Sequence, residues 1–390
     1  MNVQTIEQIA ALNIRDYGPG SRALGEILSE AKKQAESESA ETGVAAALNN
    51  GDIDGVLLRI LETPEAVLKG MNLAAHAMGT GNQVLFVPDQ AEDELVERLK
   101  DACAEYGVRL ERGIVDVRAY QNWALVHIVT MEALYERANG AEADGVYISL
   151  DGRTLKKERP DVLLSDLLEN PSEVKGFLSG YEFFGPSAAG RTLGELKIEN
   201  GLFRPLGPRD CIVRETEKRL MKFCVQSCGK CVFCREGLLQ LQQIQKDIME
   251  GRGKKEQLEL TGEIAGAMPV STPCTLGQNA SRIALSALEL FAGEIEEHVK
   301  KKNCPAGQCK SFVNYYIDPM LCTGCGDCAD ACEADCIEGK SGFIHMIDAF
   351  DCTKCGKCAQ ACGDEAVKLA SGKLPKLPAK LTKVGKFKKR

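Results

Sequence analysis

Long apolar runs are absent from this chain of 390 residues. No stretch approaches the roughly 20 apolar residues that a membrane helix needs, so the sequence predicts no membrane insertion. The first residues, MNVQTIEQIAALNIRD, contain neither the basic segment nor the apolar segment of a signal peptide. A chain of this length is expected to hold about two to four domains, and 44% hydrophobic residues suffice for a sizeable core.

A net basic charge is also absent from most of the sequence. The formal net charge is −8, but residues 371–390 carry eight Lys or Arg and no acid, which leaves −16 on residues 1–370. An acidic body of this kind argues against nucleic acid as the main partner. The simplest interpretation of the basic tail is a solvated or disordered terminus, and the alternative is a strap that docks on an acidic partner subunit.

Cysteine, in contrast, is abundant. Eighteen cysteines outside a secreted context indicate metal ligation in a reducing cytosol and not disulfides, so we expect a cytoplasmic protein. Twelve of the eighteen fall into three sets with the spacing of iron–sulfur ligands. No motif of hydrolytic catalysis accompanies them, and thiolates this dense predict a protein that transfers electrons.

Two of the three sets form an internal repeat near the C-terminus, each reading C-x2-C-x2-C-x3-C. In two-cluster ferredoxins the first three cysteines bind one [4Fe–4S] cluster and the fourth belongs to the other. The repeat therefore predicts one site made of Cys322, Cys325, Cys328 and Cys362, and a second made of Cys352, Cys355, Cys358 and Cys332. Zinc is disfavoured, because a tetrahedral site needs two pairs of cysteines and not two sets of four. The prolines that usually follow the fourth cysteines are missing, and Cys336 is interpreted as a bystander.

The third set lies upstream, in SCGKCVFCREG, where Cys228, Cys231 and Cys234 supply three thiolates. A four-iron cluster needs a fourth ligand, and Cys274 in STPCTLGQNA is the natural candidate. A zinc site built from three cysteines and one further ligand is the alternative interpretation of this spacing.

A mixed group of possible ligands stands between the upstream set and the repeat. His298, Cys304 and Cys309 form H-x5-C-x4-C, a pattern that suits zinc. The spacing allows Cys211 or Cys224 as the fourth ligand, and the alternative is a set of buried thiols without metal.

The N-terminal third alternates apolar strand patterns with amphipathic helix patterns. Strands are expected at 44–50, 82–89 and 109–117, and helices at 21–41, 64–79 and 91–107. This alternation is typical of βαβ units around a mostly parallel sheet. Short strands with glycine and proline up to about residue 210 indicate a small α+β module. Four helices with short connections follow, the last of them unbroken over 279–302, and indicate a bundle.

Longer motifs carry a family resemblance. SCGKCVFCREG, with Cys274 in CTLGQNA, closely resembles the cluster-bearing bundle of the flavin-carrying NADH dehydrogenase subunit of respiratory complex I. The run CPAGQCKSFVNYYIDPMLCTGCGDCADAC resembles the β subunit of NAD-linked, electron-bifurcating [FeFe] hydrogenases, in which a two-cluster ferredoxin domain follows the bundle. The resemblance covers residues 206–370. It implies a zinc site at Cys211, His298, Cys304 and Cys309, because Cys211 stands at the family's offset before the cluster motif.

The resemblance also implies a multidomain α/β and α+β architecture. We expect a degenerate flavoprotein-like parallel-sheet domain at 1–140 and a ubiquitin-like module at 141–210. A cluster-binding four-helix bundle at 211–303, a two-cluster ferredoxin domain at 304–370 and the basic tail at 371–390 follow.

The flavin apparatus of that family is missing. The family's loop reads G-R-G-G-A-G-F-P, whereas residues 17–25 read YGPGSRALG and have too few glycines for the backbone to approach a phosphate. The family's Gly-Glu-Glu motif is absent, and LVHIVTMEAL stands where the family has paired asparagines. In that family an acidic Asp/Glu loop lies beside the flavin, and of this loop Asn49, Asn50 and Asp52 remain here. We therefore expect that neither FMN nor NADH binds.

The sequence thus predicts an electron-transfer subunit of a multisubunit oxidoreductase complex in anaerobic metabolism. It would hold three [4Fe–4S] clusters and one zinc, with no catalytic residue of its own. The expected partners are redox subunits, including a flavoprotein or [2Fe–2S] subunit and a catalytic subunit. The alternative is an FMN-containing, NAD(P)H-oxidising subunit of a bifurcating or hydrogenase-type complex. A purely structural scaffold is disfavoured, because all twelve cluster ligands are present.

Overall fold

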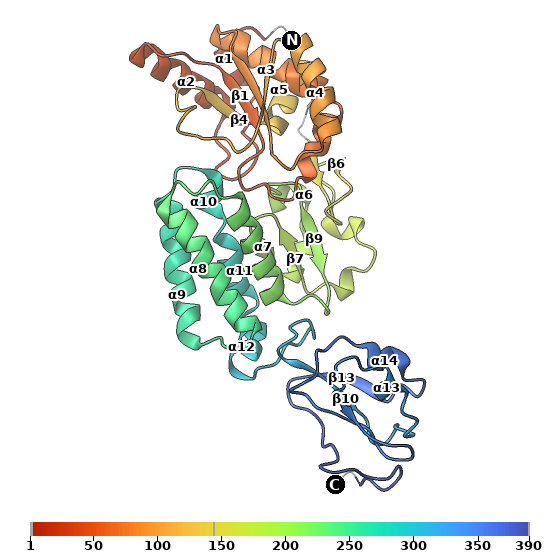
Figure 1. Cartoon of the computed structure of the whole chain (residues 1–390). Helices are drawn as coiled ribbons and strands as arrows, with labels where there is room; N and C mark the ends of the chain where they lie inside the picture. The colour runs from red at the N-terminus through yellow and green to blue at the C-terminus, as the bar shows by residue number, and fades with distance from the viewer. Residues whose placement is uncertain (1–2, 143–144, 389–390) are drawn as a thin grey trace. The chain divides into compact units, whose positions relative to one another are not determined.

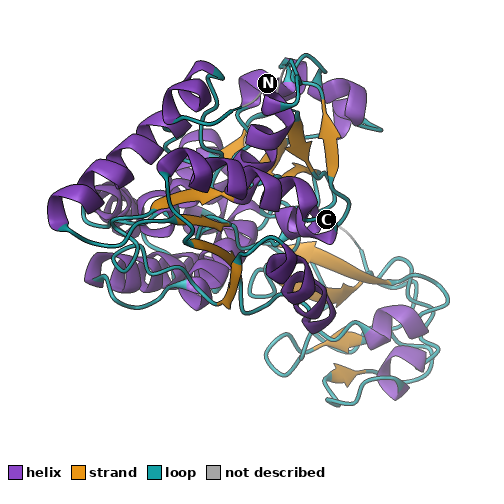
Figure 2. Cartoon of the chain, turned by 90° about the horizontal axis from the view of Figure 1, so that it is seen from above, coloured by secondary structure: helices purple, strands orange, loops and turns teal. Residues whose placement is uncertain are grey.

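The structure is a computed structural model that describes residues 3–142 and 145–388 (Figure 1). Contacts divide the chain into two units with interleaved segments. The first unit comprises Met1–Gly207, Arg219–Leu241 and Thr261–Leu290, and the second comprises Pro208–Lys218, Gln242–Leu260 and Phe291–Arg390. Helices and short strands are mixed through the chain, as expected of α/β and α+β architecture (Figure 2). The five domains expected from the sequence stay a prediction.

A parallel four-stranded sheet forms the centre of the N-terminal part. Its order is β3-β2-β1-β4, built from β1 (Val44–Ala47), β2 (Gln83–Val87), β3 (Arg109–Arg112) and β4 (Ala124–His127). Val44 of β1 lies opposite Gln83 on one side and Ala124 on the other. All four residues of β1 are buried, as is typical of a strand covered on both faces.

The helices of this part are α1 (Ile6–Ala11), α2 (Leu24–Glu38), α3 (Glu65–Met78), α4 (Asp93–Glu105) and α5 (Ile128–Ala138), with a 3-10 helix, η1 (Val56–Glu62). Helix α3 ends at Gly79 with φ 75°, the left-handed cap that glycine provides without strain. Strand β3 ends at Arg112 and is shorter than expected. Strand β4 and helix α5 both come from the apolar run around LVHIVTMEAL, where the sequence showed no turn residue to separate them.

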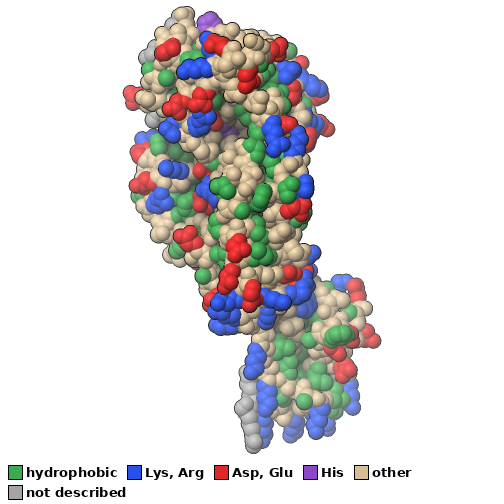
Figure 3. Space-filling model, turned by 90° about the vertical axis from the view of Figure 1, so that its left-hand side faces the viewer, with side chains coloured by type: hydrophobic (Ala, Val, Ile, Leu, Met, Phe, Trp, Pro, Cys, Tyr) green, Lys and Arg blue, Asp and Glu red, His purple; other side chains and the backbone are tan. Residues whose placement is uncertain are grey.

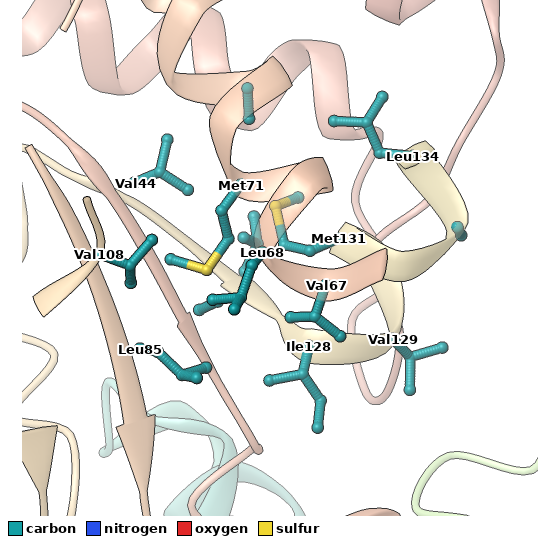
Figure 4. Packing of buried hydrophobic residues seen from close by; sticks show 14 of the residues in the cluster. Val44, Val67, Leu68, Met71, Leu85, Val108, Ile128, Val129, Met131 and Leu134 are labelled. Atoms are coloured by element: carbon teal, nitrogen blue, oxygen red, sulfur yellow. The ribbon is translucent and has the colours of Figure 1, made fainter. Parts of the chain in front are cut away.

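Helices α3 and α5 pack closely on one face of this sheet. Figure 4 shows Met71 and Leu68 of α3 beside Met131 of α5 in the buried core. A Cβ placed on Gly70 would lie 1.8 Å from the Met131 carbonyl oxygen, so only glycine allows the two backbones to approach this closely.

The rest of the first unit up to residue 207 consists of short elements. A pair of antiparallel strands, β5 (Val146–Ile148) and β6 (Lys156–Glu158), precedes a three-stranded antiparallel sheet in the order β8-β7-β9. The elements of the latter part are β7 (Gly176–Ser179), β8 (Phe183–Phe184), α6 (Leu193–Leu196) and β9 (Phe203–Leu206), with 3-10 turns η2 (Leu164–Leu167), η3 (Pro171–Glu173) and η4 (Pro186–Gly190). This part combines short strands with short helices, as expected of an α+β module, and its likeness to ubiquitin stays a prediction.

The cysteine-bearing middle of the chain is helical. Its helices are α7 (Ile212–Gln226), α8 (Val232–Met249), α9 (Lys255–Val270), α10 (Thr275–Asn279), α11 (Arg282–Leu290) and α12 (Ala292–Lys300). The expectation of one unbroken helix over 279–302 was wrong. Phe291 adopts φ −127° and ψ 28°, which are not helical values, and Gly293 just beyond it has low helix propensity.

The C-terminal segment has two related halves. Strand β10 (Val313–Ile317) pairs antiparallel with β13 (Val367–Ser371), and β11 (Ile337–Glu338) pairs antiparallel with β12 (Met346–Ile347). Short helices α13 (Asp327–Asp330) and α14 (Lys357–Ala361) begin after Gly326 and Gly356, which have φ 107° and 81°.

The basic tail is not disordered in its described part. The Ile344 N–H donates to the Thr382 carbonyl over 2.8 Å, and the Val384 N–H donates to the Gly342 carbonyl over 3.1 Å. Phe387 packs against the buried cluster of the C-terminal segment. Its neighbours in the second unit thus satisfy part of its backbone, while its described side chains stay exposed or half-buried, as expected of a solvated terminus. Its lysines point outward, and blue side chains gather at the lower end of Figure 3.

Within the residues that the structure describes, none of the helices combines the length and the apolarity that a membrane crossing requires.

Candidate iron–sulfur and zinc sites

The two C-terminal cysteine sets meet across the repeat. The sulfur of Cys328 lies close enough to three other cysteine sulfurs to interact with them electrostatically, namely those of Cys322, Cys325 and Cys362. Burial, followed by these neighbours, raises the pKa of the Cys328 thiol to about 11. The fourth cysteine of the second half thus lies with the first three of the first half, which is the arrangement that a [4Fe–4S] cluster needs.

The second half shows the reciprocal arrangement. The electrostatic neighbours of Cys358 are Cys352, Cys355 and Cys332, and burial is the main cause that raises its pKa. Loops with positive φ bend each three-cysteine run around its site, at Gly324 (φ 75°) in one half and Lys354 (φ 58°) in the other. The thiols lie where ligands are expected, and their ligation stays a prediction.

A fifth thiol lies beside the second site. Cys336 Sγ is 3.4 Å from Cys332 Sγ, and Cys336 is buried. The sequence interpretation treated Cys336 as a bystander. Its spacing four residues after Cys332 was the available signal for this contact.

The upstream set also converges. Cys234, early in α8, has Cys274, Cys231 and Cys228 as electrostatic neighbours, and burial raises its pKa to about 11. Cys274 is the residue before α10, so the predicted fourth ligand stands at the start of a helix. The four sulfurs come together from two segments that are forty residues apart in sequence.

Two polar groups approach the upstream thiols. Arg118 Nη2 lies 3.5 Å from Cys231 Sγ, and Ser227 Oγ lies 3.6 Å from Cys234 Sγ. Lys230 forms an ion pair with Asp116 over 2.5 Å, which ties the cysteine loop to the loop of Arg118. Hydrogen bonds and charge next to cluster sulfurs tune the reduction potential. Sequence reasoning missed Arg118, because its contact joins residues 113 positions apart.

The candidate zinc ligands form a compact, buried group. One donor atom from each of Cys211, His298, Cys304 and Cys309 lies within 4.8 Å of the others. Cys211 Sγ lies 3.3 Å from His298 Nε2 and 3.6 Å from Cys309 Sγ. Tetrahedral zinc with bonds of about 2.3 Å to sulfur separates its ligand sulfurs by about 3.8 Å, so the geometry fits. Of the two fourth ligands that the spacing allowed, Cys211 belongs to this group and Cys224 does not.

Local contacts orient the zinc candidates. His298 Nδ1 donates to the Glu294 carbonyl oxygen over 2.8 Å, which leaves Nε2 free to face the three sulfurs. Burial lowers the pKa of His298, but hydrogen bonds to Cys211 and Cys304 outweigh it and raise the pKa to about 10. A divalent cation bound by these residues would likewise neutralise the negative charge of the cysteine thiolates.

A cavity of about 470 Å³ opens where β1 and β4 end. Its lining includes Asn49, His127 and the cluster-ligand candidate Cys274. The carboxyl ends of two parallel strands whose crossovers run in opposite directions are the usual place of a ligand crevice in an open α/β sheet.

Several polar groups in and near this cavity have partners within the chain. The Leu24 N–H at the start of α2 donates to the Ile14 carbonyl over 2.9 Å. Arg22 pairs with Glu30 over 2.5 Å. The side-chain amides of Asn49 and Asn50 donate to the carbonyls of Tyr17 (3.4 Å) and Val115 (3.0 Å).

The remnant of the acidic loop is bound internally. Asp52 accepts hydrogen bonds from Tyr181 Oη over 3.0 Å, from the Asn49 N–H over 3.1 Å and from His127 Nε2 over 3.0 Å. His127 Nδ1 accepts from the Val129 N–H, which places the ring proton on Nε2. Asp52 lies outside the lining of the 470 Å³ cavity.

Comparisons with known proteins agree with the cysteine pattern. Residues 215–298 match the family described as the NADH-ubiquinone oxidoreductase-F iron-sulfur binding region, and residues 315–338 match the 4Fe-4S binding domain. The chain is 37% identical over 131 residues to the NADP-reducing hydrogenase subunit HndC of Solidesulfovibrio fructosivorans, which is 33% of this chain and 26% of that protein. It is 32% identical over 130 residues to the F component of the NADH-quinone oxidoreductase of Streptomyces coelicolor, which is 33% of this chain and 28% of that protein. The aligned region thus spans about a quarter of these relatives' length.

The fold resembles a solved structure over a longer range. An NAD+-reducing [NiFe]-hydrogenase in the H2-reduced state superposes with a TM-score of 0.63 and 16% identity, over 76% of this chain and 62% of that chain. At this identity the likeness concerns the fold alone. Together these matches confirm the resemblance seen in the sequence: residues 215–298 are similar to the iron–sulfur binding region of NADH–ubiquinone oxidoreductase F, and residues 315–338 are similar to a 4Fe–4S binding domain.

Proposed function

We propose that this protein is an iron–sulfur electron-transfer subunit of a cytoplasmic, multisubunit oxidoreductase complex of anaerobic metabolism. One observation carries the proposal: all twelve predicted ligand thiols lie in three groups of four. Each group supplies the thiolates of one [4Fe–4S] cluster. A bound cluster takes up and releases single electrons, and these residues hold it and set its potential.

The surroundings of the three groups of thiols support different reduction potentials for the clusters that they would hold. Arg118 and Ser227 approach the upstream sulfurs, and positive charge or a hydrogen bond stabilises the reduced, more negative cluster. Each group has one exposed cysteine, namely Cys228, Cys325 or Cys355, which is the situation expected of clusters that exchange electrons with a partner.

Zinc would serve structure in this scheme, since it has no redox chemistry. Its candidate ligands come from the start of α7, from α12 and from the loop after α12. Ser371 Oγ, at the end of β13, donates to the Cys304 carbonyl over 2.8 Å. A zinc ion at this point would fix the C-terminal segment to these helices.

The absence of a flavin is part of the proposal. The amides of Asn49 and Asn50 are engaged, Arg22 is paired with Glu30, and Asp52 is bound to His127 and Tyr181. A flavin phosphate needs N–H donors that are free to bind it, and these contacts engage several side-chain donors in and near the cavity. They support a chain that takes its electrons from partner redox subunits. The partners proposed are a flavoprotein or [2Fe–2S] subunit and a catalytic subunit.

The exposed lysines of the tail support the proposal that one of these partners has an acidic surface. Among the described lysines of the tail, Lys373, Lys376, Lys380, Lys383, Lys386 and Lys388 are all exposed. Docking on an acidic partner subunit would pair these charges, as the strap interpretation of the sequence suggested.

A second candidate function is an FMN-containing, NAD(P)H-oxidising subunit. The observation that favours it is the 470 Å³ cavity at the ends of β1 and β4, with Cys274 in its wall. A flavin in this crevice would lie beside the upstream cluster.

Flavin content separates the two candidates. The chain is purified alone under anaerobic conditions and extracted with acid, and released FMN is measured by fluorescence. A second sample is titrated with NADH while cluster absorbance is followed. We expect no stoichiometric FMN and no cluster reduction. One FMN per chain, or reduction by NADH without partners, would overturn the proposal in favour of the second candidate.

A further inference from the structure

Position 336 breaks the internal repeat of the C-terminal segment. The ligand candidates of the two halves correspond at an offset of 30 residues, and the same offset relates Cys336 to Ala366. Each of these two residues stands four positions after the fourth cysteine of its half, Cys332 or Cys362. One half therefore has a thiol where the other half has a methyl group.

The backbone around the two positions is the same in both halves. The Asp348 N–H donates to the Cys336 carbonyl and the Asp318 N–H donates to the Ala366 carbonyl, each over 2.8 Å. The residues just before them, Asp335 and Glu365, have φ of 48° and 50°. Cys336 is 5% exposed and Ala366 is 2% exposed, so both side chains point inward.

The extra thiol lies within reach of the second cluster site. Its sulfur is 3.4 Å from the sulfur of Cys332. Cys336 also shares the lining of one small cavity with the site's other candidate ligands, namely Cys332, Cys352, Cys355 and Cys358. Two sulfurs this close can reach the same iron after a small rotation of either side chain.

We propose that Cys332 and Cys336 are alternative ligands for one iron of the cluster held by Cys352, Cys355 and Cys358. The incoming thiol gives up its proton as it bonds iron, and the released thiolate takes up a proton. The exchange therefore changes neither the electron count nor the charge of the ligand set. This inference rests on the proposed function, because it requires a [4Fe–4S] cluster at this site.

The exchange gives one cluster a reserve ligand that the other lacks. Loss of Cys332 as a ligand would leave Cys336 to complete the site. At the site of Cys322, Cys325 and Cys328, loss of Cys362 leaves only the methyl group of Ala366 in the equivalent place.

Five variants of the full chain test the proposal, and the fifth adds Ala366→Cys to Cys362→Ala. Cys332→Ala and Cys362→Ala remove the same ligand from the two halves, and Cys336→Ala makes the first half like the second. The double variant Cys332→Ala/Cys336→Ala removes both alternatives. Iron and acid-labile sulfide are measured after anaerobic purification, and the reduced clusters are examined by electron paramagnetic resonance.

We expect Cys332→Ala and Cys336→Ala to keep the wild-type iron content, with an altered resonance spectrum in Cys332→Ala. Cys362→Ala and the double variant should each lose iron from one cluster. Adding Ala366→Cys to Cys362→Ala should restore that iron. If Cys332→Ala loses as much iron as Cys362→Ala, the inference is wrong. If the wild-type chain itself holds no cluster at this site, the proposed function fails first, so the two failures can be distinguished.

Discussion

At the scale of residues, the candidate ligands could be predicted because the ligands of one metal site often stand a few positions apart. Such short spacings can be recognised in a single sequence. The C-x2-C-x2-C runs and H-x5-C-x4-C each place several donors on one loop or helix end. Arg118 beside Cys231 could not be predicted, since that contact depends on how the chain folds. Cys211 was implied by the family resemblance, whereas spacing alone left Cys224 equally possible.

The candidate zinc site yields a prediction at this scale. Cys304→Ser should lower the zinc content from about one per chain to near zero, because a structural site needs all four ligands. It should also increase proteolysis of the C-terminal segment, since Cys304 connects to Ser371 through two hydrogen bonds. Zinc is measured by elemental analysis after anaerobic purification.

The matched control for the zinc site is Cys224→Ser, which changes the cysteine outside the group of four. Its zinc content should equal that of the unaltered chain. Unchanged zinc in Cys304→Ser, or loss of zinc in Cys224→Ser, would contradict the ligand set.

At the scale of elements, periodicity and caps predicted β1, β2 and the helices α2 to α4 close to their observed bounds. The junction of β4 and α5 was missed, because His127 ends the strand and caps the helix with no glycine or proline between them. The break at Phe291 was missed because the apolar pattern continues through it. Gly293, two residues later, was the local signal that the apolar pattern concealed.

The packing of α3 on α5 gives a prediction for elements. Gly70→Ala should lower the melting temperature, because the new methyl group would overlap the Met131 carbonyl. Overpacking of this kind lowers the free energy of unfolding by about 1–3 kcal/mol, because neighbouring atoms must shift to make room. The control is Gly262→Ala on α9, where nothing lies within 4 Å of the new atom. It should stabilise by about 0.5–1 kcal/mol. Thermal unfolding under anaerobic conditions checks both, and equal shifts for the two variants would contradict a tight contact between α3 and α5.

At the scale of the whole molecule, the chain combines segments similar to iron–sulfur binding domains with a parallel α/β sheet, beside which a cavity has several of its polar groups paired within the chain. Composition predicted the acidic body and the basic tail, but not that the tail would pair with residues 342–344. That pairing joins backbone N–H and carbonyl groups, so the order of lysines in the sequence does not predict it. The proposed role as an electron relay depends on how many clusters the molecule holds.

Iron and acid-labile sulfide, measured on the anaerobically purified chain, test that claim most directly. Three four-iron clusters predict about twelve iron and about twelve sulfide per chain. Values near eight of each would mean that one of the three groups of thiols holds no cluster, and the proposed relay would be contradicted.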